Sequence, residues 1–393
     1  MNHRIRGLLA ASTMAAGSFF SCDGGGAFPP EPVSIKCPAA AHQGQAITLV
    51  VGARANSPAP GLPDEVQGLI REAAKNSKQV QIVRVDGEPT VALDATFKTD
   101  GNNPDIRDRE LRTFLDQVSG YGKTLKPKKP QADVLTALTV AARSTPANGT
   151  IVVIDSGIPT IGPLSFTNPE MFTADPKEVV EFLGSEKLMP DLDKRNVVLV
   201  GLGDTADPQP ALPENLHKQV TDLWTTIAEK AGAGCVYALK SAATRTAVPT
   251  DVPVSVVALP KPPVFPECGT TVLTDSSPVG FTVDTADFRD PKGARATLKQ
   301  LATRMAGHSQ RVQLTGTTSS EGSDAANQDL SERRADAVED VLVDLGVAQS
   351  RISARGAGEH YPGRVRDTTA EGTLIPSAAV RNRSVVVKLS CDG

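Results

Sequence analysis

A proline-rich segment divides this chain of 393 residues into two blocks. From Ala247 to Cys268 it reads AVPTDVPVSVVALPKPPVFPEC. Proline fixes φ and lacks a backbone N–H, so this density resists helix and central strand and favours an extended connector. We therefore expect a first domain at 37–245, a linker at 246–267 and a second domain at 268–391. Each block is long enough to bury its own core.

The first block alternates short apolar runs with helical patterns, which is typical of a parallel α/β sheet covered by helices. Strands are expected at residues 46–52, 79–85, 150–155, 196–201 and 235–239, and helices at 65–75, 133–143 and 216–231. The sequence KPKKP at 126–130 is expected to be a loop. This block therefore predicts an α/β domain of three layers.

The second block predicts a smaller α/β sandwich. Strands are expected at residues 280–283, 310–315, 351–355 and 384–389, and helices at 294–306 and 327–346. The order is β-α-β-α-β-β, with the helices covering one face of the sheet.

The second of these helices carries a charge on its apolar face. At 100° per residue, with Leu330 at 0°, Val341 lies at about 20°, Arg334 at about 40°, Leu345 at about 60° and Val338 at about 80°. Arg334 is thus expected in the middle of the buried face. A guanidinium there needs a carboxylate partner, since an unpaired buried charge is too costly to keep. Either the protein or a ligand supplies it.

The N-terminus has the pattern of an export signal. His3, Arg4 and Arg6 are followed by a mostly apolar stretch at 7–20 and then by Cys22. This resembles a bacterial lipoprotein signal, in which the cysteine is acylated and anchors the mature chain to a membrane. A plain secretory signal is the alternative. Residues 23–36, rich in glycine and proline, are expected to form a flexible tether.

Four further cysteines indicate an oxidising compartment. They allow three pairings, and we expect Cys37–Cys235 and Cys268–Cys391, because each pair brackets one block. Their spacing fits no zinc site, which needs close pairs of ligands. Disulfides are typical of extracytoplasmic proteins.

Composition and motifs argue against several functions. The net charge of −4 gives no electrostatic basis for binding nucleic acid, and aromatic residues make up only 4% of the chain. No run of about 20 apolar residues could span a membrane as a helix. The histidines are scattered, and neither a nucleophile elbow nor a phosphate loop occurs. We therefore expect no enzyme and no cofactor.

Three phrases of the first block carry a family resemblance: ADVLTAL, IVVIDSG and VGLGD, at residues 132–138, 151–157 and 200–204. Their order resembles the von Willebrand factor A-like fold, whose members often bind Mg²⁺ through a strand-end loop. Here Gly52 stands where that loop has its aspartate and Arg54 where it has a serine, so a cation would be repelled. Asp155 matches a later ligand but is expected to cap a turn. We therefore expect no metal site and a scaffold for an unknown protein partner.

Four motifs of the second block carry a more specific resemblance. They read LTGTTSSEGS, NQDLSERRA, ISARGAGEHYP and RNRSV, at residues 314–323, 327–335, 352–362 and 381–385. They resemble the OmpA-like C-terminal domain over about residues 278–390. Members bind peptidoglycan noncovalently: an aspartate of a Gly-x-Thr-Asp turn takes the ammonium of the stem-peptide diaminopimelate, and an arginine takes its carboxylate.

Position by position, the resemblance assigns four residues to this site. Arg334 is the arginine, where a bidentate pair with a carboxylate explains the residue type. Asn327 and Thr318 match residues that support the turn or the ligand. Ser319 stands in place of the aspartate and supplies no charge, although charge assistance roughly doubles the strength of a hydrogen bond.

Three interpretations of the site follow. The domain binds peptidoglycan with altered stem-peptide chemistry, or with Glu321 or Asp324 replacing the missing charge. Alternatively, the domain keeps the fold but serves as a protein-interaction module. For Arg334 alone, the third interpretation is an internal salt bridge. Arg381 and Arg383 flank the final strand, where arginines either line the groove or are simply exposed.

The first interpretation predicts a lipid-anchored envelope protein that binds peptidoglycan. The alternative is a degenerate scaffold in an envelope complex that does not bind the wall.

Overall fold

The computed structural model describes residues 44–239, 245–306 and 309–390. The expected signal, tether and lipidated Cys22 lie outside the described residues, as do Cys37 and Cys391. Cys235 and Cys268 are each in a disulfide bond. The partners proposed for them, Cys37 and Cys391, stay a prediction.

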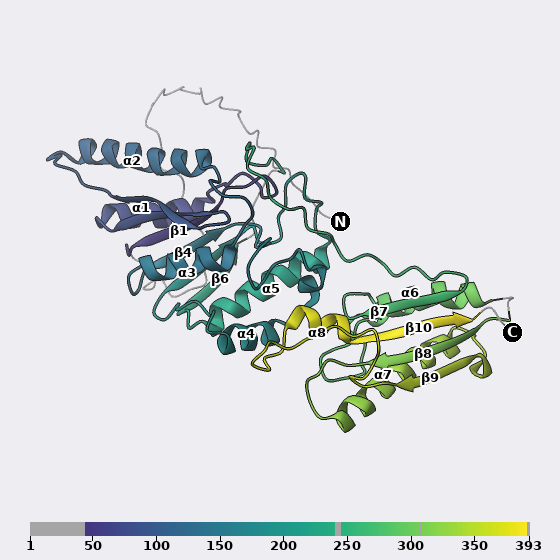
Figure 1. Cartoon of the computed structure of the whole chain (residues 1–393). Coiled ribbons are helices and arrows are strands. Elements are labelled where there is room, and N and C mark those ends of the chain that lie inside the picture. The colour runs from purple at the N-terminus through teal and green to yellow at the C-terminus, as the bar shows by residue number, and fades with distance from the viewer. Residues whose placement is uncertain (1–43, 240–244, 307–308, 391–393) are drawn as a thin grey trace, which may run out of the picture. The chain divides into compact units, whose positions relative to one another are not determined.

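Six strands form the first sheet, in the order β3-β2-β1-β4-β5-β6 (Figure 1). They are β1 (Ile47–Gly52), β2 (Gln79–Val85), β3 (Thr90–Thr96), β4 (Thr150–Ile154), β5 (Asn196–Val200) and β6 (Cys235–Leu239). All neighbours pair in parallel except β3, which pairs antiparallel with β2 at the edge. The five expected strands are present, and β3 is an addition that the sequence reading missed.

Helices cover both faces of this sheet, because its strands are apolar on both sides. The helices are α1 (Asp64–Lys75), α2 (Pro104–Thr124), α3 (Val134–Ser144), α4 (Pro176–Ser185) and α5 (Glu214–Lys230), with a short 3₁₀ helix η2 (Pro169–Thr173). Leu49 of β1 packs in a core with α1 and α2. Its neighbour Val50 packs in the opposite core, with α3, α4 and α5. The three layers therefore follow from the alternation of side chains along each strand.

The second sheet has four strands in the order β7-β10-β8-β9. Its elements are β7 (Gly269–Thr274), α6 (Pro291–Met305), β8 (Arg311–Thr317), α7 (Asp324–Asp344), β9 (Ile352–Gly356), α8 (Pro376–Asn382) and β10 (Ser384–Ser390), with a short 3₁₀ helix η3 (Gln349–Arg351). Strands β8 and β9 are parallel, and the other pairs are antiparallel. Helices α6 and α7 share one core against the sheet, whereas Val272 on the opposite face is exposed.

Two details of the second block differ from the prediction. The first strand is β7, about ten residues before the expected 280–283, where Phe281 forms only an isolated bridge to Phe288. The alternation at 280–283 arises because Phe281 is buried in the core, stacked on Phe288, and not because it lies in the sheet. The short helix α8 was not expected, so the order is β-α-β-α-β-α-β.

The buried face of α7 is also rotated from the predicted stripe. Its buried residues are Asn327, Ser331, Arg334, Ala335, Val338 and Leu342, whereas Leu330, Val341 and Leu345 are only half-buried. Arg334 therefore lies at the edge of the buried face and not in its middle. It is nevertheless buried, because the loop after β7 covers that edge.

The proline-rich segment contains no helix or strand, and part of it packs against the helices of the first sheet. Val257 is buried in the core of α3 and α5. Its N–H donates to Gln209 Oε1 at 2.7 Å, and its carbonyl accepts from Gln209 Nε2 at 2.9 Å. The part of the segment around Val257 is therefore fixed against the first block by packing and hydrogen bonds.

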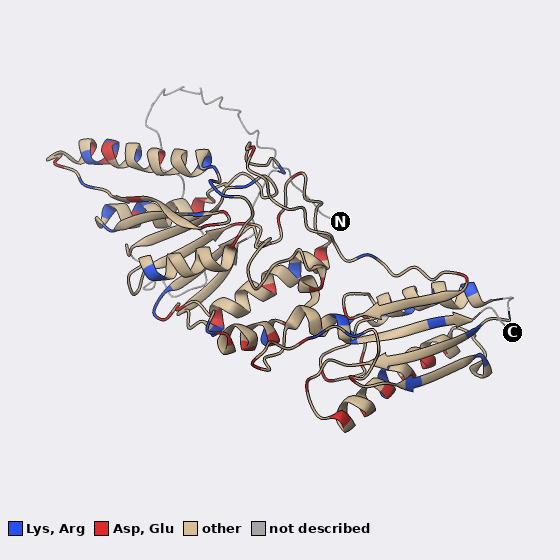
Figure 2. Cartoon of the chain, viewed as in Figure 1, with Lys and Arg blue, Asp and Glu red and all other residues tan. Residues whose placement is uncertain are grey.

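Basic and acidic residues both occur along the helices in the view of Figure 2. Within the described ranges, none of the helices combines the length and the apolar character that crossing a bilayer would require.

Candidate functional site

The first sheet has its topological switch point between β1 and β4, where ligands commonly bind at the carboxyl ends of the strands. Here that point is filled by a buried ion pair. The Arg54 guanidinium donates from Nη1 to Asp155 Oδ2 and from Nη2 to Asp155 Oδ1 at 2.8 Å. It also donates to Asn56 and Ser156.

Gly52 makes room for this pair. A Cβ at residue 52 would lie 2.5 Å from Asp155 Oδ2, so an aspartate there would clash with and repel the Asp155 carboxylate. Asp155 does cap a turn, accepting from the Gly157 N–H at 2.7 Å, but the ion pair with Arg54 is its main contact and was not foreseen. The charge of a cation at this point is already supplied by the guanidinium.

In the second block, glycines let α7 lie directly on the sheet. A Cβ at Gly316 of β8 would lie 1.8 Å from the Ser331 carbonyl oxygen, and one at Gly356 of β9 would lie 2.5 Å from Ser331 Oγ. This close contact places the N-terminal half of α7 over the carboxyl ends of β8 and β9. Asn327 and Arg334 are seven residues apart, about two turns, so both face the same side.

The Arg334 side chain is buried without a carboxylate partner. It is 1% exposed; its Nε donates to the Thr285 carbonyl at 2.9 Å, and its guanidinium carbon lies 5.2 Å from the centre of the Phe281 ring. Its Nη1 has no hydrogen-bond partner among the residues that the structure describes. Burial lowers the pKa of Arg334, and the more distant Asp275 offsets this in part. An internal salt bridge, the third interpretation, finds no carboxylate to form it among the described residues.

Thr318 and Asn327 have unpaired atoms as well. Both residues are buried, and Thr318 Oγ1 and Asn327 Nδ2 lack partners. Both residues contact Gly358. The Gly358 carbonyl accepts from the Thr318 N–H at 3.0 Å, and its Cα faces the Asn327 backbone. Three of the four residues assigned from the sequence therefore share one property, a buried polar atom that the protein leaves unused. Buried groups of this kind call for a ligand or water.

The fourth residue, Ser319, contacts Arg383, one of the two arginines expected either to line the groove or to be exposed. Arg383 is buried, and its Nε donates to Ser319 Oγ at 3.1 Å. Its Nη2 also lies 3.5 Å from Glu321 Oε2. Arg381, by contrast, is exposed. Arg383 also interacts electrostatically with Arg334, so the site holds two guanidinium groups.

The main partner of Arg383 comes from α4 of the first block. Glu178 Oε1 lies 2.6 Å from Nη2, and Glu178 Oε2 accepts from Nη1 at 3.0 Å. Burial alone would lower the pKa of Arg383, but the paired carboxylate raises it. Burial raises the pKa of Glu178, and the pair with Arg383 offsets this only in part.

Asp367 fixes the turn that carries these residues. It accepts from the Ser320 N–H at 3.0 Å, from Ser320 Oγ at 2.7 Å and from Asn382 Nδ2 at 2.8 Å. Burial would raise the pKa of Asp367, but the hydrogen bonds from Asn382 and Ser320, with the charge of Arg364, outweigh it and lower the pKa. Asn382, next to Arg383, is thereby tied to the same turn.

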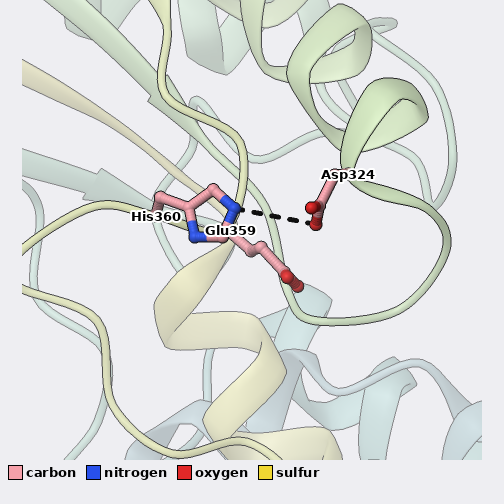
Figure 3. Close-up of side chains that lie close together, drawn as sticks. All are labelled: Asp324, Glu359 and His360. Atoms are coloured by element: carbon pink, nitrogen blue, oxygen red, sulfur yellow. Dashed lines mark ion pairs between the residues drawn. The ribbon is translucent and has the colours of Figure 1, made fainter.

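Of the two carboxylates considered as substitutes for the missing aspartate, only Glu321 lies near Ser319. Asp324 is exposed and points toward His360, with Oδ1 3.6 Å from Nε2 (Figure 3). Asp324, Glu359 and His360 bring ligand atoms within 4.8 Å of one another. Exposed groups gather in this way without an ion, and no buried unpaired atom lies among them, so we assign this cluster no ligand.

Comparisons with known proteins single out the same block. Residues 281–373 match the model of the OmpA family. Outer membrane protein A of Shigella flexneri is 35% identical over 133 residues, which is 33% of this chain and 38% of that protein. Outer membrane porin F of Pseudomonas fluorescens is 51% identical over 75 residues, 19% of this chain and 22% of that protein. The chain thus spans well under half the length of these relatives.

Solved structures similar to this chain include the peptidoglycan-associated lipoprotein from Burkholderia pseudomallei, at 22% identity and a TM-score of 0.25, covering 30% of this chain and 89% of that one. The cell wall anchor of the T6SS from Pseudomonas aeruginosa is 23% identical, with a TM-score of 0.25, covering 31% of this chain and 81% of that one. Three of the four motifs lie within residues 281–373, which form an OmpA-like domain, and the fourth, at 381–385, follows them.

Proposed function

We propose that this chain is a cell-envelope protein that binds the stem peptide of peptidoglycan through its OmpA-like domain. The observation that carries the proposal is the unpaired Nη1 of the buried Arg334, in the domain that also holds the unpaired Thr318 Oγ1 and Asn327 Nδ2. A ligand carboxylate would supply the missing acceptor, and a charge-assisted hydrogen bond in a buried site is a strong one. The relatives, outer-membrane proteins by name, support an extracytoplasmic envelope location.

The test is retention on purified sacculi. The wild-type chain is expected to sediment with them, and Arg334→Ala to stay in the supernatant. Arg333→Ala is the matched control, because Arg333 is the next residue of α7 but is exposed and pairs with Asp329. Retention of Arg334→Ala at the wild-type level would refute the assignment. Failure of the wild type to sediment would favour the alternative, a scaffold that does not bind the wall.

We further propose that the first block is a von Willebrand factor A-like scaffold without its metal. Its strand order, the antiparallel edge strand β3 and the position of Asp155 support this. The Arg54 guanidinium takes the role of the cation by pairing with Asp155. Calorimetric titration with Mg²⁺ is expected to give no heat, and a saturable binding signal would refute this proposal.

We also propose that the protein is extracytoplasmic and is anchored to a membrane through an acylated Cys22. The mass of the intact mature protein tests this directly. A mass that includes the acyl chains on residue 22 is expected, and an unmodified chain would refute the anchor. The same measurement before and after reduction counts the disulfides.

A further inference from the structure

The buried, unpaired polar atoms of the OmpA-like site favour one kind of ligand group. Arg334 Nη1 and Asn327 Nδ2 can only donate hydrogen bonds, and the Thr318 hydroxyl can donate or accept. A charged donor favours a charged acceptor, and a carboxylate is the acceptor that pairs best with a guanidinium.

The same site offers little to an ammonium group. Ser319 Oγ already accepts from Arg383 Nε, so an ammonium placed there would approach a guanidinium. The buried carboxylates nearby are used: Asp275 accepts from the Phe281 N–H and lies 3.9 Å from Arg289, and Glu178 pairs with Arg383. Asp367 is likewise satisfied, by Ser320, Asn382 and Arg364.

Exposed carboxylates also lie near the site. Asp284 interacts electrostatically with Arg334 but is exposed, so its charge is screened by solvent. Glu321 is close to Ser319: its Oε2 lies 3.5 Å from Arg383 Nη2, and its side chain is 52% exposed. It is therefore shared with a cation and screened by solvent, so its attraction for a second cation is weak. A free amine beside the bound carboxylate would thus lose its water without gaining a charged acceptor.

We propose that this site selects a carboxylate whose neighbouring amine is acylated, and discriminates against the zwitterion with a free ammonium. An amide nitrogen is neutral and donates one hydrogen bond, which the Thr318 hydroxyl can accept. In the wall, such a group arises where the side-chain amine of a stem peptide is closed into an amide cross-link. The inference rests on the proposed function and specifies which form of the stem peptide is bound.

The experiment compares two peptides on the full chain by isothermal titration calorimetry. One is a diaminopimelate-containing stem tetrapeptide with a free side-chain amine, and the other is the same peptide acetylated on that amine. We expect the acetylated peptide to bind at least about tenfold more tightly. Ser319→Asp is expected to narrow the difference, because its carboxylate would neutralise the Arg383 guanidinium that otherwise repels the ammonium. Ser319→Ala, which supplies no carboxylate, should keep the wild-type preference.

The outcomes separate this inference from the function on which it rests. Equal affinities, or tighter binding of the free amine by the wild-type chain, would overturn the selectivity while leaving peptidoglycan binding in place. Failure of both peptides to bind would overturn the proposed function itself. The comparison of the two peptides on the wild-type chain is decisive even if Ser319→Asp does not fold. A thermal unfolding curve shows whether that variant is folded under the conditions of the titration.

Discussion

Two arginines of this chain are equally buried, each 1% exposed, but their surroundings differ. Arg54 in the first block meets a carboxylate on two nitrogens, and its third also has a partner. Arg334 in the second block meets a carbonyl on one nitrogen and an aromatic ring, and its Nη1 is unused. The first arrangement is electrostatically complete, and the second lacks an anion.

We infer from this difference that Arg54 is structural, and we propose that Arg334 binds a ligand. Desolvating a guanidinium costs several kcal/mol, and only a well-placed anion returns that energy. At the β1–β4 switch point the chain provides the anion itself, so the position that commonly holds a ligand is closed. In the OmpA-like domain the described residues provide no such anion for Arg334, and under the proposed function the carboxylate of a ligand would provide it.

The largest expected effect tests the closed site. Arg54→Met leaves the Asp155 carboxylate buried without its cation, and breaking a buried pair in this way costs about 3–5 kcal/mol in the free energy of unfolding. Urea denaturation measures it. Arg54→Met with Asp155→Leu removes both charges and is expected to recover most of the loss. If the single variant is as stable as the wild type, Arg54 is not the structural cation that we infer.

The matching change in the open site should behave differently. Arg334→Met removes an unpaired charge, so the free energy of unfolding is expected to change by less than about 1 kcal/mol, since the lost contact with Phe281 is offset by the desolvation that is no longer needed. Affinity for the stem peptide should fall by about 2–5 kcal/mol, roughly thirtyfold or more. Paired urea and calorimetry measurements on this variant check both values. A variant that loses stability and keeps its affinity would show that Arg334 is structural.

The roles of the two arginines could not be predicted equally well from the sequence. Arg334 could be found because a charge among apolar residues at helical spacing is conspicuous, and the motif around it assigned Thr318, Ser319 and Asn327. The predicted orientation of its helix was less accurate. Leu330 and Val341 are apolar but only half-buried, whereas the polar residues Asn327 and Ser331 are buried. Gly316 and Gly356 explain this: the helix approaches the sheet through small and polar residues on that face.

Arg383 and Glu178 could not be predicted in the same way. An arginine next to a strand is usually exposed, and only its position after Asn382 in the last motif suggested otherwise. Its partner is 205 residues away in the sequence, on a helix that was not predicted. Helix α2 was missed for a related reason, since only Leu111, Val118 and Gly122 among its 21 residues are buried. Pairings between distant segments leave no local pattern.

A third, smaller effect concerns the turn that supports the open site. The pKa of Asp367 lies below its ordinary value of 3.8, so the folded chain binds a proton there less readily than the unfolded chain. Its contribution to stability is therefore present above pH 3.8 and is lost as the pH falls through the folded-state pKa. Asp367→Asn is expected to cost about 1–3 kcal/mol at pH 7, through the donors it leaves unsatisfied.

Urea denaturation at pH 7 and pH 3 measures this effect as the difference between wild type and variant, which should shrink at the lower pH. Asp336→Asn, an exposed change on α7, is the control and should show no such dependence. A difference for Asp367→Asn that grows on acidification would contradict the assigned direction of the pKa.

The smallest effect tests the contact that joins the two regions, and its pH dependence has the opposite sign. Burial raises the pKa of Glu178 above its ordinary value of 4.5, so the folded chain binds a proton there more readily than the unfolded chain. Its contribution to stability is therefore present below pH 4.5 and is lost as the pH rises through the folded-state pKa. Glu178→Gln cannot titrate, so the stability of the wild type relative to this variant should fall between pH 4 and pH 7. Glu181→Gln, exposed on the same helix, should show no change. A difference that does not vary with pH would contradict the assigned direction of the pKa of Glu178.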